Sequence, residues 1–80
     1  MKRYILVIDQ GTTTTRCIIF NNFGEIEWVE KKELRQIYPN PGWVEHNPDE
    51  IWDSVLITIK KSLESLNLKP KDITSIGITN

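Results

Sequence analysis

Residues 4–16 read Tyr4-Ile5-Leu6-Val7-Ile8-Asp9-Gln10-Gly11-Thr12-Thr13-Thr14-Thr15-Arg16. The apolar run up to Ile8 favours a buried β-strand, so Asp9 falls where that strand leaves the core. A second apolar strand follows from Arg16, and Gly11, with φ > 0, would let the chain turn back to pair antiparallel with the first. These residues predict a β-hairpin with an acid and several hydroxyl groups at its turn.

This predicted turn carries the groups that a polyphosphate needs. Thr12, Thr13 and Thr14 offer hydroxyl donors beside the backbone N–H groups, and Arg16 adds a permanent cation. Asp9 can hold Mg²⁺ directly or through water. The turn matches neither a Walker A loop nor a Gly-x-Gly-x-x-Gly fingerprint, so a hairpin would bind the phosphates. The alternative interpretation is a structural hairpin, because threonines favour strands and a strand-end aspartate can accept backbone hydrogen bonds.

Length and composition describe one small globular domain. The chain has 80 residues, 39% hydrophobic and 26% charged, and its net charge of −1 argues against nucleic acid or an anionic membrane as the main partner. Cys17 is the single cysteine, so it cannot form an intrachain disulfide and is expected to pack as a small hydrophobe. No signal peptide or membrane span is visible, and we expect a cytoplasmic location with no membrane span.

Three strands are predicted before the middle of the chain, over residues 3–8, 15–21 and 25–34. The first two are apolar almost throughout, which predicts that both of their faces are covered. Gly24 is a natural left-handed turn position before the third strand. In that strand, alternation predicts Ile26 and Trp28 on the inward face.

An irregular, aromatic segment follows over residues 36–46, where two prolines and a glycine prevent a long helix. The favoured interpretation is that Tyr38 and Trp43 pin this loop onto the sheet. The alternative is that they line a ligand cleft or contact another domain. His46 has no partners at a metal-ligand spacing, so it is interpreted as a hydrogen-bonding loop residue rather than a zinc ligand.

A helix is predicted over residues 48–66. Asn47 can cap it, Pro48 suits its first position, and Glu50 stands where a capping box requires an acid. Its apolar stripe consists of Ile51, Trp52, Val55, Leu56, Ile59, Leu63 and Leu66. A last strand over residues 73–79 would return parallel to the first, with Ile76 and Ile78 on one face.

The predicted order is therefore an antiparallel three-stranded meander, then a helix, then a parallel strand, which is an α/β fold. One helix can cover only one sheet face. Since the first two strands look buried on both, the pattern predicts further protein over the other face, from a partner subunit or from more of the same chain.

Three blocks of the sequence resemble the amino-terminal segment of the glycerol kinases, a branch of the sugar-kinase family in the actin and hexokinase ATPase superfamily. They are residues 4–16, residues 36–48 with residues 50–52, and residues 76–80. The Asp-Gln-Gly-Thr-Thr turn at residues 9–13 is typical of the broader sugar-kinase family. The block Tyr38-Pro39-Asn40-Pro41-Gly42-Trp43-Val44-Glu45-His46 is more particular to the glycerol kinases.

The resemblance implies a ribonuclease-H-like, actin-like ATPase domain, of which residues 1–80 would be the amino-terminal part in a two-domain kinase. It implies ATP or ADP as the nucleotide, Mg²⁺ at Asp9, glycerol as the substrate and a homo-oligomeric full-length enzyme. The implied nucleotide-binding residues are Gly11, Thr12, Thr13, Thr14 and Arg16. Thr12 would also lie near the phosphorylated product.

The same resemblance places no catalytic residue within residues 1–80, because the acceptor site and the catalytic base come later in the family. A chain of this length is therefore expected to be inactive alone, since phosphoryl transfer depends on positioning and charge neutralisation by the complete site. Three alternatives stay open: another sugar or polyol kinase of the family, a different ATPase of the superfamily, and a truncated binding or assembly module without catalysis.

Overall fold

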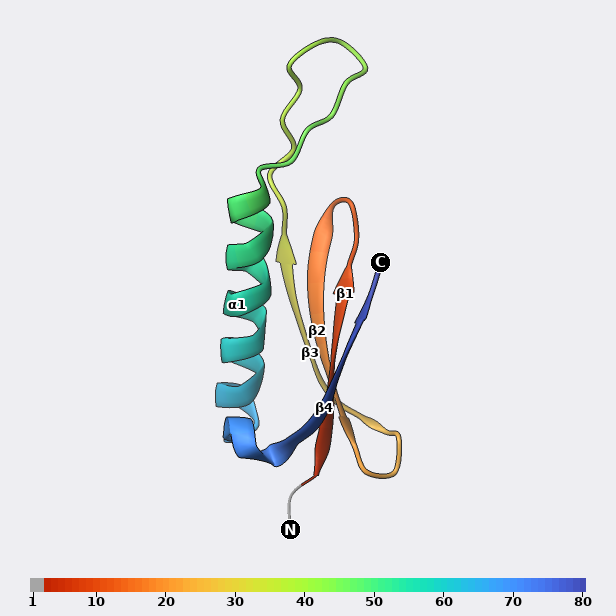
Figure 1. The fold of residues 1–80 in the computed structure, drawn as a ribbon, viewed down its shortest axis with the longest axis vertical. Helices are drawn as coiled ribbons and strands as arrows, with labels where there is room; N and C mark the ends of the chain where they lie inside the picture. The colour runs from red at the N-terminus through yellow and green to blue at the C-terminus, as the bar shows by residue number, and fades with distance from the viewer. Residues whose placement is uncertain (1–2) are drawn as a thin grey trace.

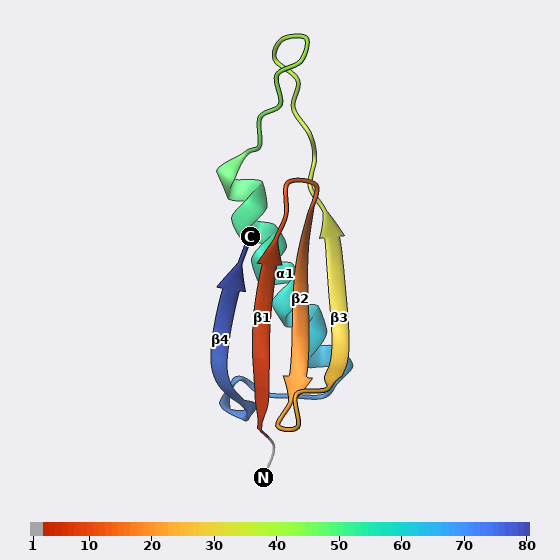
Figure 2. The same ribbon diagram turned by 90° about the vertical axis from the view of Figure 1, so that its right-hand side faces the viewer.

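A computed structural model describes residues 3–80 and shows one sheet with one long helix against it (Figure 1). The elements are β1 (Tyr4–Gln10), β2 (Thr14–Asn21), β3 (Ile26–Glu33), α1 (Pro48–Ser65), a short 3₁₀ turn η1 (Pro70–Asp72) and β4 (Ile73–Thr79). The sheet order is β3-β2-β1-β4, with β4 parallel to β1 and the other pairs antiparallel (Figure 2). The predicted meander, helix and parallel strand are confirmed. The turn η1 was not predicted.

The core lies between α1 and one face of the sheet. Strand alternation sends Leu6 and Ile8 of β1, with Cys17 and Ile19 of β2, toward the helix, and all four are buried together with Leu68. The partly buried residues packed against this cluster are Tyr4, Trp28, Val55, Ile59, Leu63, Leu66 and Ile73. The expectation that Cys17 packs as a small hydrophobe is confirmed by its complete burial.

The helix residues buried most deeply against the sheet are small hydroxyl residues, and stripe residues such as Val55 and Ile59 pack beside them. Ser54, Thr58 and Ser62 repeat every four positions and are fully buried. Thr58 and Ser62 return their hydroxyls to backbone carbonyls one turn earlier, so burial leaves neither group without a partner. Trp52 and Leu56, which the stripe placed in the core, are exposed, because α1 lies mainly over β2 and β3 and turns that side of the helix away from them.

Both ends of α1 have recognisable caps. The Asn47 side chain accepts from the Asp49 backbone N–H at 2.9 Å, as predicted. Glu50 does not complete the expected capping box; its carboxylate accepts from Arg35 at 2.8 Å instead. At the other end, Asn67 takes a left-handed φ of 53°, and the Leu68 N–H bonds to the Leu63 carbonyl in a Schellman arrangement.

The prediction that Ile26 and Trp28 share the inward face is wrong. Trp28 pairs with Ile19, but Ile26 pairs with Phe20, so Glu27 is an extra residue in a β-bulge. The bulge shifts the alternation by one position, and Ile26 falls on the face away from α1 with 59% of its surface exposed.

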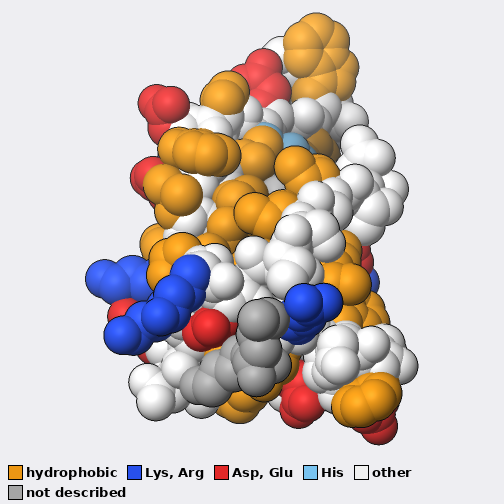
Figure 3. Space-filling view, turned by 60° about the horizontal axis from the view of Figure 1, so that its bottom comes forward, with side chains coloured by type: hydrophobic (Ala, Val, Ile, Leu, Met, Phe, Trp, Pro, Cys, Tyr) orange, Lys and Arg blue, Asp and Glu red, His pale blue; other side chains and the backbone are white. Residues whose placement is uncertain are grey.

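Within residues 3–80 no element covers the sheet face away from α1, and Ile5 and Val29 are exposed there. Ile76 and Ile78 share one face of β4, as predicted, but both are exposed because α1 lies over the other half of the sheet. Figure 3, which views the molecule from the lower end of Figure 1, shows hydrophobic side chains gathered across the middle of that surface. The prediction that further protein covers the second face stays a prediction.

The aromatic loop projects away from the sheet as a narrow extension beyond the hairpin (Figure 1). Ile37 and Glu45 form a two-way bridge, and a turn at Asn40 closes the tip with Gly42 at a φ of 81°. Tyr38 and Trp43 are 67% and 63% exposed, so the interpretation that they pin the loop onto the sheet is wrong. The backbone bridge, rather than aromatic packing, gives this loop its shape.

Replacing a buried core side chain should destabilise this fold far more than replacing an exposed one. Ile19 has no exposed surface, so Ile19→Ala should lower the free energy of unfolding by about 2–5 kcal/mol through lost burial and a cavity. The matched control Ile26→Ala, on the bulged edge strand, should change it by less than about 1 kcal/mol. Urea unfolding measures both, and equal losses would contradict the assigned faces.

Candidate functional site

The β1–β2 hairpin turns over residues 11–13 and is closed by a hydrogen bond from the Gly11 N–H to the Thr14 carbonyl at 2.8 Å. Gly11 does not take the positive φ that the sequence predicted; Gly24 and Gly42 do. Glycine is favoured at position 11 for a different reason. A Cβ there would stand 3.2 Å from the Thr14 carbonyl oxygen, so the closed turn leaves little room for a side chain.

The four consecutive threonines occupy three different environments. Thr15 pairs with Gln10 on the face under α1 and is fully buried. Thr14 and Arg16, one position to either side, lie on the opposite face, where Arg16 stands beside Asp9. Thr12 and Thr13 form the exposed turn itself. The predicted nucleotide residues therefore lie together at one end of the sheet, and Thr15 belongs to the core.

The turn directs acceptors inward and leaves donors outward. The Thr13 carbonyl accepts from the Leu34 N–H at 2.8 Å, and the Thr12 carbonyl accepts from the Gln36 side chain at 3.1 Å. Within residues 3–80 the N–H groups of Thr12 and Thr13 donate to no other protein atom, and their side-chain hydroxyls make no hydrogen bond. The exposed N–H and hydroxyl donors of this turn suit an anion. Its peptide dipoles present their positive N–H ends to solvent, because the carbonyls are hydrogen-bonded to the protein.

Asp9 and Arg16 form an ion pair at this end of the sheet, with 2.5 Å between Asp9 Oδ2 and Arg16 Nη2. Their positions are directly opposite in the β1–β2 register. A guanidinium has five N–H donors, so Arg16 keeps others available for a phosphate oxygen. The ion pair thus fixes a cation beside the turn without using its full hydrogen-bonding capacity.

A metal ion at Asp9, as the sequence predicted, would have this single carboxylate as its protein ligand within residues 3–80. Among the described residues, no three histidine, cysteine, aspartate or glutamate side chains come together as a metal cluster. Mg²⁺ is commonly held by one or two carboxylates together with phosphate oxygens and water. The second carboxylate oxygen of Asp9, Oδ1, makes no hydrogen bond within residues 3–80, so this one acid could serve such a site.

Two anchors of the turn were missed by the sequence analysis. Gln36 reaches the Thr12 carbonyl and also contacts His46, whose Nε2 lies 3.0 Å from Gln36 Oε1. The prediction that His46 is a hydrogen-bonding loop residue is confirmed by this contact. On the buried side, the hydroxyls of Thr15 and Ser54 lie 2.7 Å apart. No spacing rule links these positions, because each contact joins residues distant in the sequence.

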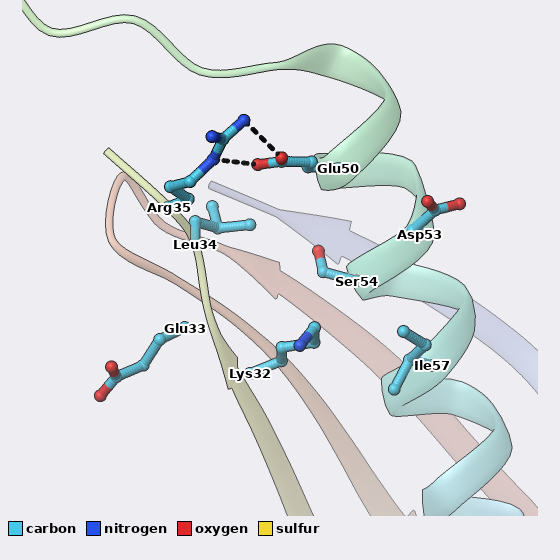
Figure 4. Close-up of a pocket in the computed structure, with 8 residues that line it drawn as sticks. All are labelled: Lys32, Glu33, Leu34, Arg35, Glu50, Asp53, Ser54 and Ile57. Atoms are coloured by element: carbon cyan, nitrogen blue, oxygen red, sulfur yellow. Dashed lines mark hydrogen bonds and ion pairs between the residues drawn. The ribbon is translucent and has the colours of Figure 1, made fainter. Parts of the chain in front are cut away.

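A separate groove of about 320 Å³ lies between the end of β3 and the start of α1 (Figure 4). Its lining residues are Lys32, Glu33, Leu34, Arg35, Glu50, Asp53, Ser54 and Ile57. Figure 4 shows Arg35 and Glu50 joined across one end of it. This ion pair holds the chain that leaves β3 against the first turn of α1. The groove lies below it, between α1 and the end of β3.

Cys17 is not a candidate nucleophile. Burial raises the pKa of its thiol, a nearby Glu30 raises it further, and a hydrogen bond with Ser62 opposes the shift. Because the thiolate is the reactive form, a buried thiol with a raised pKa stays protonated and inert at neutral pH.

Comparison with known proteins gives a consistent result. Residues 4–80 match the model of the FGGY family of carbohydrate kinases, N-terminal domain. A glycerol kinase from Halothermothrix orenii is 56% identical over 79 residues, which cover 99% of this chain and 16% of that enzyme. This chain therefore spans about a sixth of the length of that relative.

Solved structures with the same arrangement are also sugar and polyol kinases. A gluconate kinase from Lactobacillus acidophilus superposes with a TM-score of 0.86 at 26% identity, over 98% of this chain and 15% of that one. A Plasmodium falciparum glycerol kinase solved with ADP gives 0.78 at 27% identity, over 96% and 15%. No helix within residues 3–80 has the length and apolar character of a membrane span.

The raised pKa of Cys17 predicts a loss of stability at alkaline pH. Its contribution is complete below the unfolded thiol pKa of about 8.5 and declines above it, because the unfolded chain then releases the proton first. Urea unfolding at pH 7 and pH 9.5 should show a larger decrease for the unmodified protein than for Cys17→Ala. An equal decrease in both proteins would show that this thiol has no shifted pKa.

Proposed function

This chain belongs to the FGGY family of carbohydrate kinases, and from this premise we propose that it supplies the ATP-phosphate-binding hairpin of a glycerol kinase. In this proposal residues 1–80 are the amino-terminal part of the first ribonuclease-H-like domain of a two-domain enzyme. The complete enzyme transfers the γ-phosphoryl group of ATP to glycerol and yields glycerol 3-phosphate.

The observation that carries the proposal is the polarity of the turn at residues 11–13. Two backbone N–H groups and neighbouring hydroxyls face solvent, while the carbonyls of Thr12 and Thr13 are engaged by Gln36 and Leu34. A polyphosphate spreads negative charge over many oxygens and needs such a set of donors. Arg16 places its cation beside them, held by Asp9.

Each residue has a distinct task in this site. Thr12 and Thr13 would bind phosphate oxygens through their N–H and hydroxyl groups, and Thr14 would add a hydroxyl on the open face. Arg16 would neutralise charge, and Gly11 keeps the turn closed enough for the backbone to approach the nucleotide. Thr12, at the exposed tip, would also face the transferred phosphoryl group in the product.

Mg²⁺ bound to the nucleotide supplies charge neutralisation on the phosphates. Asp9 would hold that ion directly or through water, since one protein carboxylate with phosphate oxygens is a common Mg²⁺ environment. The same carboxylate orients Arg16 through their ion pair. Asp9 would therefore contact both positive charges of the site, Mg²⁺ and the Arg16 guanidinium.

Glycerol is favoured as acceptor by sequence similarity. The Halothermothrix orenii relative, at 56% identity, is a glycerol kinase, whereas the gluconate kinase shares 26%. The aromatic loop over residues 36–46, with its exposed Tyr38 and Trp43, carries the segment most particular to the glycerol kinases. Another polyol or sugar as acceptor is the alternative within the family.

The acceptor can be identified with the full-length protein, Mg-ATP and a panel of glycerol, xylulose and gluconate. We expect glycerol to give the highest kcat/KM, measured by coupled ADP release. Efficient phosphorylation of another member of the panel, with glycerol hardly used, would leave the phosphate site intact and refute glycerol as the substrate. Absence of any nucleotide-dependent activity or binding would refute the kinase proposal itself.

The cation of Arg16 can be tested against a neighbour on the same face. Arg16→Gln should lower kcat/KM for ATP about ten- to hundredfold, because a charged hydrogen bond contributes about 1.5–3 kcal/mol. Lys31 lies directly opposite Arg16 in the β2–β3 register, is also exposed and makes no ion pair within residues 3–80. Lys31→Gln should therefore have little effect, and equal losses in the two variants would indicate a general charge effect instead.

A further inference from the structure

A fully buried polar contact lies directly beneath the proposed phosphate turn. The hydroxyls of Thr15, on β2, and Ser54, on α1, are 2.7 Å apart, and neither residue has any exposed surface. The two positions are 39 residues apart in the sequence. This contact is therefore a tertiary link between the helix and the hairpin.

The link continues in both directions as a chain of side chains. Ser54 Oγ lies 2.6 Å from the Ile51 carbonyl within α1, and Thr15 Oγ1 lies 2.9 Å from Gln10 Oε1. Gln10 Nε2 in turn lies 3.2 Å from the Gly11 carbonyl. The chain thus runs from the helix, through the core, to the backbone of the turn.

Proton counting makes Gln10 the adjustable member of this chain. Three oxygen–oxygen contacts join Ile51, Ser54, Thr15 and Gln10, but two hydroxyls supply only two protons. All three can be hydrogen bonds when the Gln10 amide turns and presents its NH₂ group to Thr15. That rotation gives up the donation to the Gly11 carbonyl. The chain reaches the turn when Ser54 donates to Thr15 instead of the Ile51 carbonyl, Thr15 donates to Gln10 Oε1, and Gln10 Nε2 donates to the Gly11 carbonyl.

The pair is not needed simply to fill space. Valine has the shape of threonine and alanine nearly that of serine, and replacing both partners of a buried hydrogen bond by apolar groups of similar shape is often nearly neutral for stability. A valine–alanine pair could therefore occupy the same core volume. The hydroxyls add direction to the contact, because a hydrogen bond fixes one orientation of Thr15 where apolar packing would allow several.

We propose that Thr15 and Ser54 are positioning residues, which set the orientation of the phosphate turn by tying it to α1 through Gln10. This inference rests on the proposed nucleotide site. The turn then has an anchor on each side, the buried chain at Thr15 and the side chain of Gln36 at the Thr12 carbonyl. Without the Thr15–Ser54 contact the turn stays folded, because the hydrogen bond from the Gly11 N–H to the Thr14 carbonyl still closes it. The turn is then free to shift relative to α1.

The test is a double-mutant cycle in the full-length protein with Thr15→Val, Ser54→Ala and the double variant. The readouts are the Kd for Mg-ADP by calorimetry and the midpoint of thermal unfolding. Each single variant should weaken ADP binding about three- to tenfold, and the double variant about as much as one single variant, because both remove the same contact. The unfolding midpoint of the double variant should stay close to that of the unmodified protein.

Two further variants separate positioning from general packing. Thr15→Ser keeps the hydroxyl and should retain most of the ADP affinity despite losing a buried methyl group. Thr58→Val is the matched control, since Thr58 is equally buried on α1 but bonds only to carbonyls of its own helix. It should leave the ADP affinity unchanged. The proposal is overturned if ADP affinity follows the unfolding midpoint across all variants, or if Thr58→Val weakens binding as much as Thr15→Val.

Failure of the nucleotide site itself would be recognised separately. If the unmodified protein binds no Mg-ADP, the proposed function fails, and hydrogen exchange of the peptide spanning residues 9–16 then decides the positioning role. Exchange at this turn should be faster in Thr15→Val and Ser54→Ala than in Thr58→Val. Equal exchange in all three would overturn the inference.

Discussion

The antiparallel register of β1 and β2 is the constraint on which the rest of this structure depends. It places Gln10 opposite Thr15 and Asp9 opposite Arg16, and a shift of either strand by one residue would move the side chains of that strand to the other face. The close approach of the Gly11 N–H to the Thr14 carbonyl helps to hold that register at the turn. Charged groups are thereby kept on the open face, and the hydroxyl that meets α1 is kept in the core.

The remaining elements hold this hairpin in place. β3 and the segment after it engage the outer carbonyls of the turn, through Leu34 and Gln36, while α1 reaches Thr15 from below through Ser54. The helix can approach β2 closely because small hydroxyl residues face the sheet. A larger side chain at Ser54 would separate the layers and break the contact with Thr15.

Sequence patterns predicted the elements well because their signals are local. The apolar runs, Gly24 in its turn and the cap at Asn47 act within a few residues of each other, and all three are confirmed. The predictions were wrong where a contact between residues distant in the sequence determines which face a side chain takes. Ile26 changed face because of a bulge in the pairing with β2, and Trp52 is exposed because the position of α1 over the sheet depends on which side chains fit between them.

The sequence by itself determined the order of strands and helix, the family to which the chain belongs, and the residue types at the turn. Tertiary structure alone decided what each threonine does, since four identical side chains in a row carry no local information about face. Only pairing with β1 buries Thr15, and only packing of α1 brings Ser54 to it across 39 positions. The engaged carbonyls that leave the turn's donors outward depend likewise on Gln36, whose role appears only after β3 has folded beside the hairpin.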